Sequence, residues 1–478
     1  MDFSALPPAP APPVPGLEVP VLDGPGSQTP QSLTRALSSL PEADREAPAL
    51  VVATSGSTGT PKRTLLTTGA LRASGRATAE ATDSDGAQWL LALPVHYVAG
   101  AQVIARSVLA GTTPVTTASL APGTGFTAAD FLAAVERMTH PRRMTALVPT
   151  QLHVLLEAAD SGVVPAGQLH EALRSFQAIL LGGAPASAGL RERIRELGLP
   201  VVTTYGSAET AGGCVYDGRA LPGVEVRIEP TTPEDGPGAY GRGCAPGTPF
   251  PAASGLLAGS SPSAVDEDAA GRPGRIWLGG PAVAAGYLAD PARHAEHFRV
   301  DAHGTRWYRT DDLGTLEPAS SQADAARPEG TAGQRLSVVG RADDVLITGG
   351  VKVSARAVAA ALEEVPGVRE ALVVGVPHPR WGQAVAAMVA VPGLPGTTPT
   401  GPDHPADARE DADAREGSGA RESAELEHRL RAAVRERLGP AAVPKRLEVV
   451  RALPLTSTGK PDRAAVARAL AAPRHRPE

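Results

Sequence analysis

The sequence predicts a large N-terminal α/β domain with mixed, mostly parallel sheets, helices and a β-rich subdomain, followed by a small α+β domain. Three observations indicate this fold class. The chain has 478 residues, which is too many for one compact core. Between about residues 48 and 205, short apolar runs alternate with stretches of helical periodicity. Beyond about residue 220, shorter strand-like runs separated by turns replace this alternation.

The elements of the large domain follow from the order of its apolar runs. Strands are expected at 47–55, 63–68, 87–94, 144–150, 176–183 and 200–206. Helices are expected at 69–81, 100–111, 127–138, 151–159 and 189–197. Two further strands, 223–230 and 274–280, are expected in the β-rich part. Apolar runs that alternate with helices are typical of a largely parallel sheet covered by helices.

The last part of the chain is predicted to form a separate small domain. Two strand segments within 335–350 are expected to precede a helix at 354–365, strands at 370–377 and 384–391, and a helix at 424–438. We therefore divide the chain into a large domain, 1–340, and a small domain, 341–478.

Four segments have a composition that predicts little regular structure. Residues 1–30 are rich in proline, and we expect them to be poorly ordered. Residues 231–268, rich in Gly, Pro and Ser, and the polar residues 317–334 are interpreted as inserts. Residues 393–424 are rich in Pro and Gly and then acidic, which predicts a disordered surface loop.

Composition and charge argue against several classes of protein. A formal net charge of −6 without a long basic run disfavours a nucleic-acid-binding surface. The two cysteines form neither a disulfide framework nor a CxxC metal pair, which favours a reducing compartment. The N-terminus lacks the regions of a signal peptide, and no apolar run approaches the roughly 20 residues of a membrane span. We expect a cytoplasmic protein without a membrane span, and a homodimer is left open.

The stretch "TSGSTGTPKR", residues 54–63, is a candidate phosphate-binding loop. Its glycines allow backbone N–H groups to face an anion, its hydroxyls can donate hydrogen bonds, and its lysine adds a mobile positive charge. The candidate ligands are Thr54, Ser55, Gly56, Ser57, Thr58, Gly59 and Lys62. On composition alone, a solvated turn is an equally good interpretation.

Spacing excludes two other kinds of phosphate loop. A Walker A loop needs lysine directly after glycine, then Ser or Thr, and then a helix. Here Pro61 separates the glycine from the lysine, Arg63 follows the lysine, and the next residues are β-like. The dinucleotide fingerprint G-x-G-x-x-G is also absent here. The stretch is therefore predicted to be a Gly/Ser/Thr loop within a hairpin.

The loop resembles the phosphate loop of the adenylate-forming enzymes, which include acyl-CoA synthetases, adenylation domains and luciferases. Further motifs similar to those of this family follow in order along nearly the whole chain. They are "LLGGAPAS" at 180–187, "YGSAET" at 205–210, "GRIWLGGPAVAAGYL" at 274–288, "YRTDDLG" at 308–314, "GRADDVLITGG" at 340–350 and "PLTSTGKPDR" at 454–463. One such match is moderate evidence, but six further matches in this order are strong evidence for the resemblance.

The resemblance implies a role for each matching residue. Nucleotide contacts are implied for Gly182, Gly183, Ala184, Tyr205, Gly206, Asp312 and Arg341. Tyr205 would stack on adenine, Asp312 would accept hydrogen bonds from the ribose hydroxyls, and Glu209 would ligate Mg²⁺. Two positions depart from the family pattern: Ala208 stands where threonine is expected, and Asp311 stands where glycine is expected.

The resemblance also implies a two-step reaction that uses ATP, Mg²⁺ and CoA. A carboxylate first attacks the α-phosphorus of ATP, and Glu209 and the catalytic Lys460 would stabilise the charges that meet there. A thiol then attacks the acyl-adenylate after the small, mobile domain has rotated. Asp343 would be the hinge of that rotation, and Gly349 and Gly350 would face the pantetheine.

Within the family, the chain is most similar to the o-succinylbenzoate–CoA ligases of menaquinone synthesis in their actinobacterial form. The similarity rests on the early position of the phosphate loop, on "YGSAETAGGCVYDG" and on "LPVHYVAGAQVIARS". It implies substrate contacts for His96, Tyr97 and Arg106, with the Arg106 guanidinium binding the spare carboxylate of the acid. The alternatives are another acyl- or aryl-CoA ligase, a stand-alone adenylation enzyme, or a non-catalytic nucleotide-binding protein with the same fold.

Overall fold

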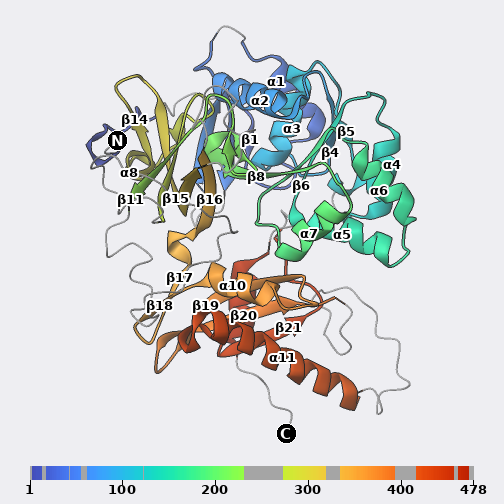
Figure 1. Ribbon diagram of the computed structural model, residues 1–478. Helices are drawn as coiled ribbons and strands as arrows, with labels where there is room; N and C mark the ends of the chain where they lie inside the picture. Colours follow the sequence, from blue (N-terminus) through green and yellow to red (C-terminus); the bar gives the residue numbers. More distant parts are fainter. Residues whose placement is uncertain are drawn as a thin grey trace, which may run out of the picture.

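The computed structural model describes most of the chain in two lobes (Figure 1). The described residues are 3–12, 18–41, 44–54, 62–121, 123–230, 273–318, 334–392, 416–456 and 461–472. The upper lobe contains three sheets and the helices up to α8, and the lower lobe contains the fourth sheet with α10 and α11. Among the described residues, no helix is both long and apolar enough to cross a membrane.

The helices of the large lobe pack around two central sheets. The first has the order β1-β2-β3-β13, and the second, with seven strands, has the order β10-β9-β8-β7-β6-β4-β5. The first sheet consists of β1 (Val21–Leu22), β2 (Pro48–Thr54), β3 (Lys62–Thr67) and β13 (Gly286–Tyr287). The second consists of β4 (Gln88–Leu91), β5 (Val115–Thr116), β6 (Arg143–Leu147), β7 (Ala178–Leu181), β8 (Val201–Ser207), β9 (Gly212–Tyr216) and β10 (Arg219–Ala220). From β5 to β8 all pairings of the second sheet are parallel, as the alternation predicted.

The third sheet is the β-rich part that the sequence predicted. Its order is β11-β12-β15-β14, with β16 paired to β15, and the pairings are antiparallel. Its strands are β11 (Glu225–Pro230), β12 (Gly274–Gly279), β14 (Phe298–Val300), β15 (Arg306–Pro318) and β16 (Gln334–Arg341). The motif "YRTDDLG" lies inside the long strand β15, where Asp312 pairs with Arg341 of β16 and the register with β12 shifts between Arg309 and Leu313.

Helices cover both faces of the seven-stranded sheet because its strands are apolar on both sides. On β4, Trp89 faces the core shared with the first sheet, whereas Leu90 faces the core under α4 to α7. The helices of this lobe are α1 (Pro30–Ser38), α2 (Thr68–Thr82), α3 (Val98–Leu109), α4 (Ala128–Glu136), α5 (Pro149–Asp160), α6 (Ala166–Arg174), α7 (Ala188–Glu196) and α8 (Pro291–His297). Short 3-10 turns are Phe3–Ala5, Ala118–Leu120 and Ala208–Thr210.

The small lobe is an α+β unit around the fourth sheet. The order is β18-β17-β20-β19, and β21 pairs with β20 in parallel. Its elements are β17 (Val345–Thr348), β18 (Val351–Ser354), α10 (Ala355–Glu363), β19 (Glu370–His378), β20 (Gly382–Ala390), α11 (Glu416–Leu438), β21 (Arg446–Val450) and α12 (Arg463–Ala471), with 3-10 turns at Ala342–Asp344 and Pro440–Ala442. Strand β16 still pairs with the third sheet up to Arg341, and β17 opens the fourth sheet. The boundary at 341 stays a prediction, and this change of sheet agrees with it.

Several sequence expectations need correction. Residues 3–12 and 18–30 were expected to be poorly ordered, but the structure gives them specific contacts: Phe3 stacks on Trp277 with ring centroids 4.2 Å apart, and Val21–Leu22 pair in parallel with β2. Residues 416–424, expected in a disordered loop, form the first turns of α11. The strand expected at 144–150 ends at Leu147, because Pro149 begins a helix.

Other expectations lie partly or wholly outside the described residues. Helix α6 was not predicted from the sequence. The insert expected at 231–268 lies wholly outside the described residues. Of the insert expected at 317–334, only 317–318 and 334 are described. Of the loop expected at 393–424, only 416–424 are described.

Candidate active site

The candidate phosphate loop connects two antiparallel strands, as its spacing predicted. Strand β2 ends at Thr54 and β3 begins at Lys62, and the Cα atoms of these two residues are paired across the hairpin. Because a strand and not a helix follows Lys62, the structure agrees with the exclusion of a Walker A loop. The predicted ligands Ser55, Gly56, Ser57, Thr58 and Gly59 lie outside the described residues.

Two predicted nucleotide residues more than 100 positions apart are brought together. The Tyr205 hydroxyl donates a hydrogen bond to Asp312 Oδ2 at 2.7 Å. Burial and the nearby Asp312 charge raise the pKa of Tyr205 well above its ordinary value, so that the hydroxyl stays protonated and keeps donating. This bond fixes the tyrosine ring at the carboxyl end of β8, next to the aspartate proposed for the ribose.

Glycines in this region allow the backbone to approach neighbouring strands closely. A Cβ atom on Gly206 would lie 2.1 Å from the Gly212 carbonyl oxygen, and one on Gly182 would lie 2.3 Å from Thr204 Oγ1. Gly183 has a φ of +83°, a region that favours glycine. Ala184 follows directly in this turn, where β7 has ended and α7 has not begun. These positions explain why "LLGGAPAS" and "YGSAET" need glycine before any ligand is considered.

Glu209 is a buried carboxylate held from the first sheet. The residue is only 5% exposed, and its Oε1 atom accepts a hydrogen bond of 2.8 Å from the Tyr287 hydroxyl. The backbone carbonyl of Glu209 accepts a further bond from Ala284 N at 2.8 Å. Burial and the Glu209 charge raise the pKa of Tyr287, so the hydroxyl remains a donor. Within the described residues, Glu209 Oε2 has no hydrogen-bond partner, which leaves one oxygen for a cation.

The turn that carries Glu209 is held by two helices. The residue after this turn, Ala211, has the left-handed conformation with a φ of +50°. Its carbonyl accepts hydrogen bonds from the Ser74 hydroxyl of α2, at 2.9 Å, and from the Gln102 amide of α3. Ala208, which stands where the family pattern has threonine, is buried in the core. Its methyl group packs there, and the position offers no hydroxyl. Ser74, Gln102 and Tyr287 were missed in the sequence, because nothing in their spacing connects them with residue 209.

The metal-binding hypothesis fits a site shared with a phosphate. Among the described residues, no group of three or more His, Cys, Asp or Glu side chains is placed to hold a metal ion. Mg²⁺, however, commonly binds proteins through one or two carboxylates while water and substrate phosphates supply the other ligands. A single buried Glu209 with a free oxygen is compatible with that kind of site.

Lys62, Asp311 and Arg341 form an ionic cluster beside Tyr287. Asp311 Oδ2 lies 3.5 Å from Lys62 Nζ and 3.4 Å from Arg341 Nη2. Lys62 Nζ also lies 5.7 Å from the centroid of the Tyr287 ring. Strand pairing explains the assembly, since Asp312 and Arg341 are partners between β15 and β16, and Tyr287 pairs with Thr64 of β3. The departure at residue 311 thus contacts two of the predicted nucleotide ligands.

The three predicted substrate residues lie at opposite ends of one helix. His96 and Tyr97 precede α3, their ring centroids are 4.0 Å apart, and burial lowers the pKa of His96 so that it stays neutral at neutral pH. Arg106 lies in the last turn, nine residues after Tyr97, which is roughly 13 Å along a helix axis. His96 and Tyr97 therefore lie at the start of α3, and the backbone of Arg106 lies at its end.

Arg106 is a buried cation without an acidic partner in the described part of the chain. The residue is 6% exposed, and its guanidinium carbon lies 5.2 Å from the centroid of the Trp89 ring. No described residue accepts a hydrogen bond from its Nε atom, which is buried. Because burying an unpaired charge is costly, this arginine is well placed to gain from an external carboxylate.

The hinge and CoA residues are only partly described. Asp343 lies in the 3-10 turn Ala342–Asp344, between the third and fourth sheets. Gly349 and Gly350 form the two-residue turn between β17 and β18, with φ of +57° and +80°. A tight hairpin turn with positive φ at both positions favours glycine even without a ligand. The predicted catalytic Lys460 lies outside the described residues.

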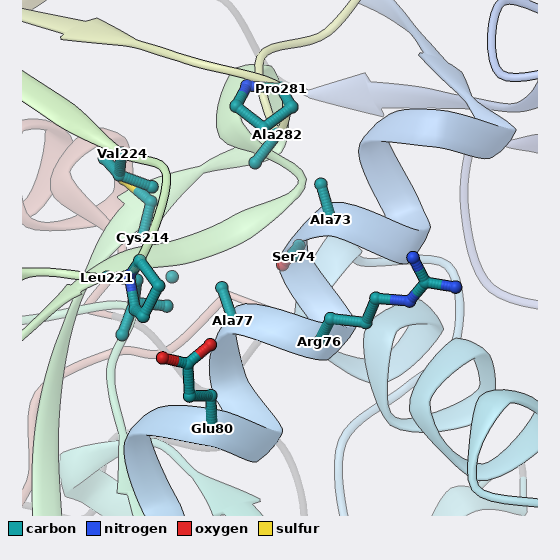
Figure 2. Close-up of a pocket in the computed structure, with 12 residues that line it drawn as sticks. Ala73, Ser74, Arg76, Ala77, Glu80, Cys214, Leu221, Val224, Pro281 and Ala282 are labelled. Carbon is teal, nitrogen blue, oxygen red and sulfur yellow. The ribbon is translucent and has the colours of Figure 1, made fainter. Parts of the chain in front are cut away.

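A separate hollow of about 170 Å³ lies between α2, strand β9 and the segment that follows β9. Figure 2 shows Ala73, Ser74 and Ala77 of α2 facing Cys214 and Val224 across it. Burial raises the pKa of the Cys214 thiol to about 12, so it is protonated and a poor nucleophile at neutral pH. None of the predicted site residues lines this hollow.

The comparisons with known proteins agree with the motifs. The family model described as AMP-binding enzyme matches residues 7–288, and that of the AMP-binding enzyme C-terminal domain matches 357–460. A probable 2-succinylbenzoate–CoA ligase from Mycobacterium tuberculosis is 35% identical over 426 residues, covering 88% of this chain and 85% of that protein. A feruloyl-CoA synthase from an Amycolatopsis species is 30% identical over 421 residues, covering 86% and 67%.

A solved structure shows the same fold. The o-succinylbenzoate CoA synthetase from Bacillus subtilis, in complex with its acyl-adenylate intermediate, has a TM-score of 0.57 and 25% identity, covering 88% of this chain and 69% of that chain. The chain belongs to the AMP-binding enzyme family. Within that family it is an AMP-forming acid–CoA ligase. The resemblance drawn from the motifs and the predicted fold class are thereby confirmed.

Proposed function

We propose that the protein converts an aromatic dicarboxylic acid, 2-succinylbenzoate, to its CoA thioester in menaquinone biosynthesis. One observation supports the choice of a diacid: Arg106 is buried without an acidic partner in the described part of the chain. A second carboxylate on the substrate would pair with this guanidinium while the first is activated elsewhere. The relative with 35% identity is named for the same substrate.

In the first half-reaction, the described residues would bind and orient ATP. Tyr205, held by Asp312, would pack on the adenine, and the same Asp312 carboxylate would accept hydrogen bonds from the ribose hydroxyls. Lys62 and Arg341 would contact the phosphates, and Lys460 would bridge them to the carboxylate of the acid. A Mg²⁺ ion held by Glu209 would neutralise phosphate charge when bound. Attack of the acid oxygen on the α-phosphorus would form the acyl-adenylate and release pyrophosphate.

In the second half-reaction, the CoA thiol would attack the acyl carbon and expel AMP. We propose that the small domain first rotates about Asp343, which moves Lys460 away and brings Gly349 and Gly350 towards the pantetheine. In the present arrangement, Glu157 of α5 and Arg369 of β19 form an ion pair of 2.8 Å between the two lobes. That pair has to break if the small domain rotates.

A pyrophosphate-release assay across a panel of acids, with and without CoA, tests this function. We expect turnover of 2-succinylbenzoate and formation of its CoA thioester and AMP. Benzoate, ferulate and fatty acids of several lengths serve as monoacid competitors. Release of pyrophosphate with none of the acids would contradict the enzyme assignment, whereas turnover of fatty acids but not of 2-succinylbenzoate would contradict the substrate.

Arg106→Ala should raise the KM for the diacid selectively. Losing one partner of a buried charge pair commonly costs enough to weaken binding by about 30-fold or more. The KM for ATP and the turnover of a monoacid should change little, because the guanidinium is proposed to contact only the second carboxylate. Arg76→Ala, at an exposed position of α2, is the matched control. An unchanged KM for the diacid would make Arg106 a structural residue.

Glu157→Gln should favour the rotated orientation of the small domain. The Glu157 side chain is 42% exposed, so the pair is worth at most about 1 kcal/mol, and the orientation equilibrium should shift by about twofold to fivefold. Fluorescence energy transfer between dyes on the two domains measures this shift. Glu171→Gln, at an exposed position on α6, is the control. Equal transfer efficiencies in the wild type and Glu157→Gln would argue against a latch.

A further inference from the structure

Asp311 contacts cations from two separate parts of the polypeptide. Both contacts are made by the same oxygen, Oδ2, at 3.5 Å from Lys62 Nζ and 3.4 Å from Arg341 Nη2. Lys62 belongs to the candidate phosphate loop and is the first residue of β3, and Arg341 is the last residue of β16 before the predicted hinge turn. One carboxylate therefore connects the phosphate loop to the strand that leads into the small domain.

The cluster is accessible to a competing anion. The side chains of Lys62, Asp311 and Arg341 are 16%, 30% and 43% exposed, so none of them is sealed in the core. Ion pairs at this exposure are individually weak. A polyphosphate could therefore replace the Asp311 carboxylate as the partner of Lys62 and Arg341. Asp312 follows Asp311 in the chain, and Glu209 binds Tyr287, whose ring Lys62 contacts. Because these carboxylates repel an anion, the attraction for an incoming nucleotide has to come from Lys62 and Arg341.

We propose that Asp311 is a built-in counter-anion that competes with the phosphates of ATP for Lys62 and Arg341. This inference rests on the proposed function, which assigns both cations to the nucleotide. Before ATP binds, the carboxylate holds the two cations together and ties the hinge strand to the phosphate loop. When ATP binds, its phosphates take over both cations, and Asp311 loses its partners. The residue thus lowers the affinity for ATP and couples nucleotide binding to release of the hinge.

If Asp311 competes with ATP, removing its charge should strengthen ATP binding, whereas removing a residue that binds ATP would weaken it. Asp311→Asn keeps the size of the side chain and removes its charge, so ATP should bind about threefold to tenfold more tightly. The KM for ATP should fall by the same factor with little change in kcat. Adenosine affinity should be unchanged, because adenosine has no phosphate. The difference between wild type and variant should shrink at about 0.5 M salt, where charges are screened within a few ångströms.

Calorimetric titration of the full-length protein with a non-hydrolysable ATP analogue, at low and high salt, measures this directly. Asp160→Asn is the matched control, because it removes a surface aspartate that also pairs with an arginine, Arg193. The melting temperature of Asp311→Asn should stay near that of the wild type. A double-mutant cycle adds a second test: in a Lys62→Met background, Asp311→Asn should gain less affinity than it does alone.

The outcomes separate this inference from the proposed function. If the wild type binds the ATP analogue but Asp311→Asn binds it equally or less tightly, the competition is overturned while the ligase function stands. The competition is also overturned if the gain is the same in the Lys62→Met background. If the wild type binds no ATP analogue at all, both proposals fail together. A gain that depends on phosphate, salt and Lys62 supports the competition.

Discussion

Replacing Glu209 with glutamine is expected to reduce pyrophosphate release by about 100-fold to 1000-fold, the range typical for loss of one preorganised electrostatic group. Glutamine has the same shape and can still accept the hydrogen bond from Tyr287, so the fold of the turn should persist. What it loses is the negative charge that would hold Mg²⁺. The effect should therefore fall mainly on kcat, and added Mg²⁺ should restore only part of the rate.

The measurement is pyrophosphate release at several Mg²⁺ concentrations, with the melting temperature recorded for each variant. Glu80→Gln, at an exposed position of α2, is the control for the charge change. Tyr287→Phe removes only the hydrogen bond of 2.8 Å that orients the carboxylate, and its effect should be smaller, about 10-fold to 100-fold. A Glu209→Gln variant with wild-type kcat and wild-type Mg²⁺ dependence would exclude this residue as a metal ligand.

Replacing Lys460 with alanine is expected to abolish adenylate formation while largely sparing thioester formation. The first half-reaction brings an anionic acid against an anionic polyphosphate, and a lysine that bridges both would contribute about 100-fold to 1000-fold. In the second half-reaction, the proposed rotation has carried this lysine away from the acyl carbon. The two half-reactions should therefore respond to the same substitution by very different factors.

The two steps can be followed separately. Pyrophosphate release from acid and ATP reports the first, and thioester formation from supplied acyl-adenylate and CoA reports the second. Lys445→Ala is the matched control, because this lysine is in the same domain and its Nζ lies over the Trp381 ring, 5.2 Å from the centroid. An equal loss in both half-reactions would contradict the rotating-domain mechanism.

Much of the fold could be predicted because local periodicity and sheet topology agree. The runs at 87–94 and 176–183 became β4 and β7, since continuous apolar runs between helices are buried on both faces of a parallel sheet. The run at 200–206 became β8 as predicted, but its residues are only half-buried or exposed. The N-terminal segment was misjudged because proline content says nothing about long-range contacts. Phe3 packs against Trp277 and Trp307, which lie 274 and 304 residues later in the chain.

The sequence by itself determined the family and the hairpin around residues 54–63, and it predicted a set of candidate nucleotide ligands, because these depend on short motifs with fixed spacing. Only the tertiary structure decided what surrounds them. It placed Tyr287 on Glu209 and left Arg106 without an acidic partner among the described residues. It also set Asp311 between Lys62 and Arg341. These contacts join residues that lie far apart in the chain, and spacing along the chain does not fix which distant elements become neighbours.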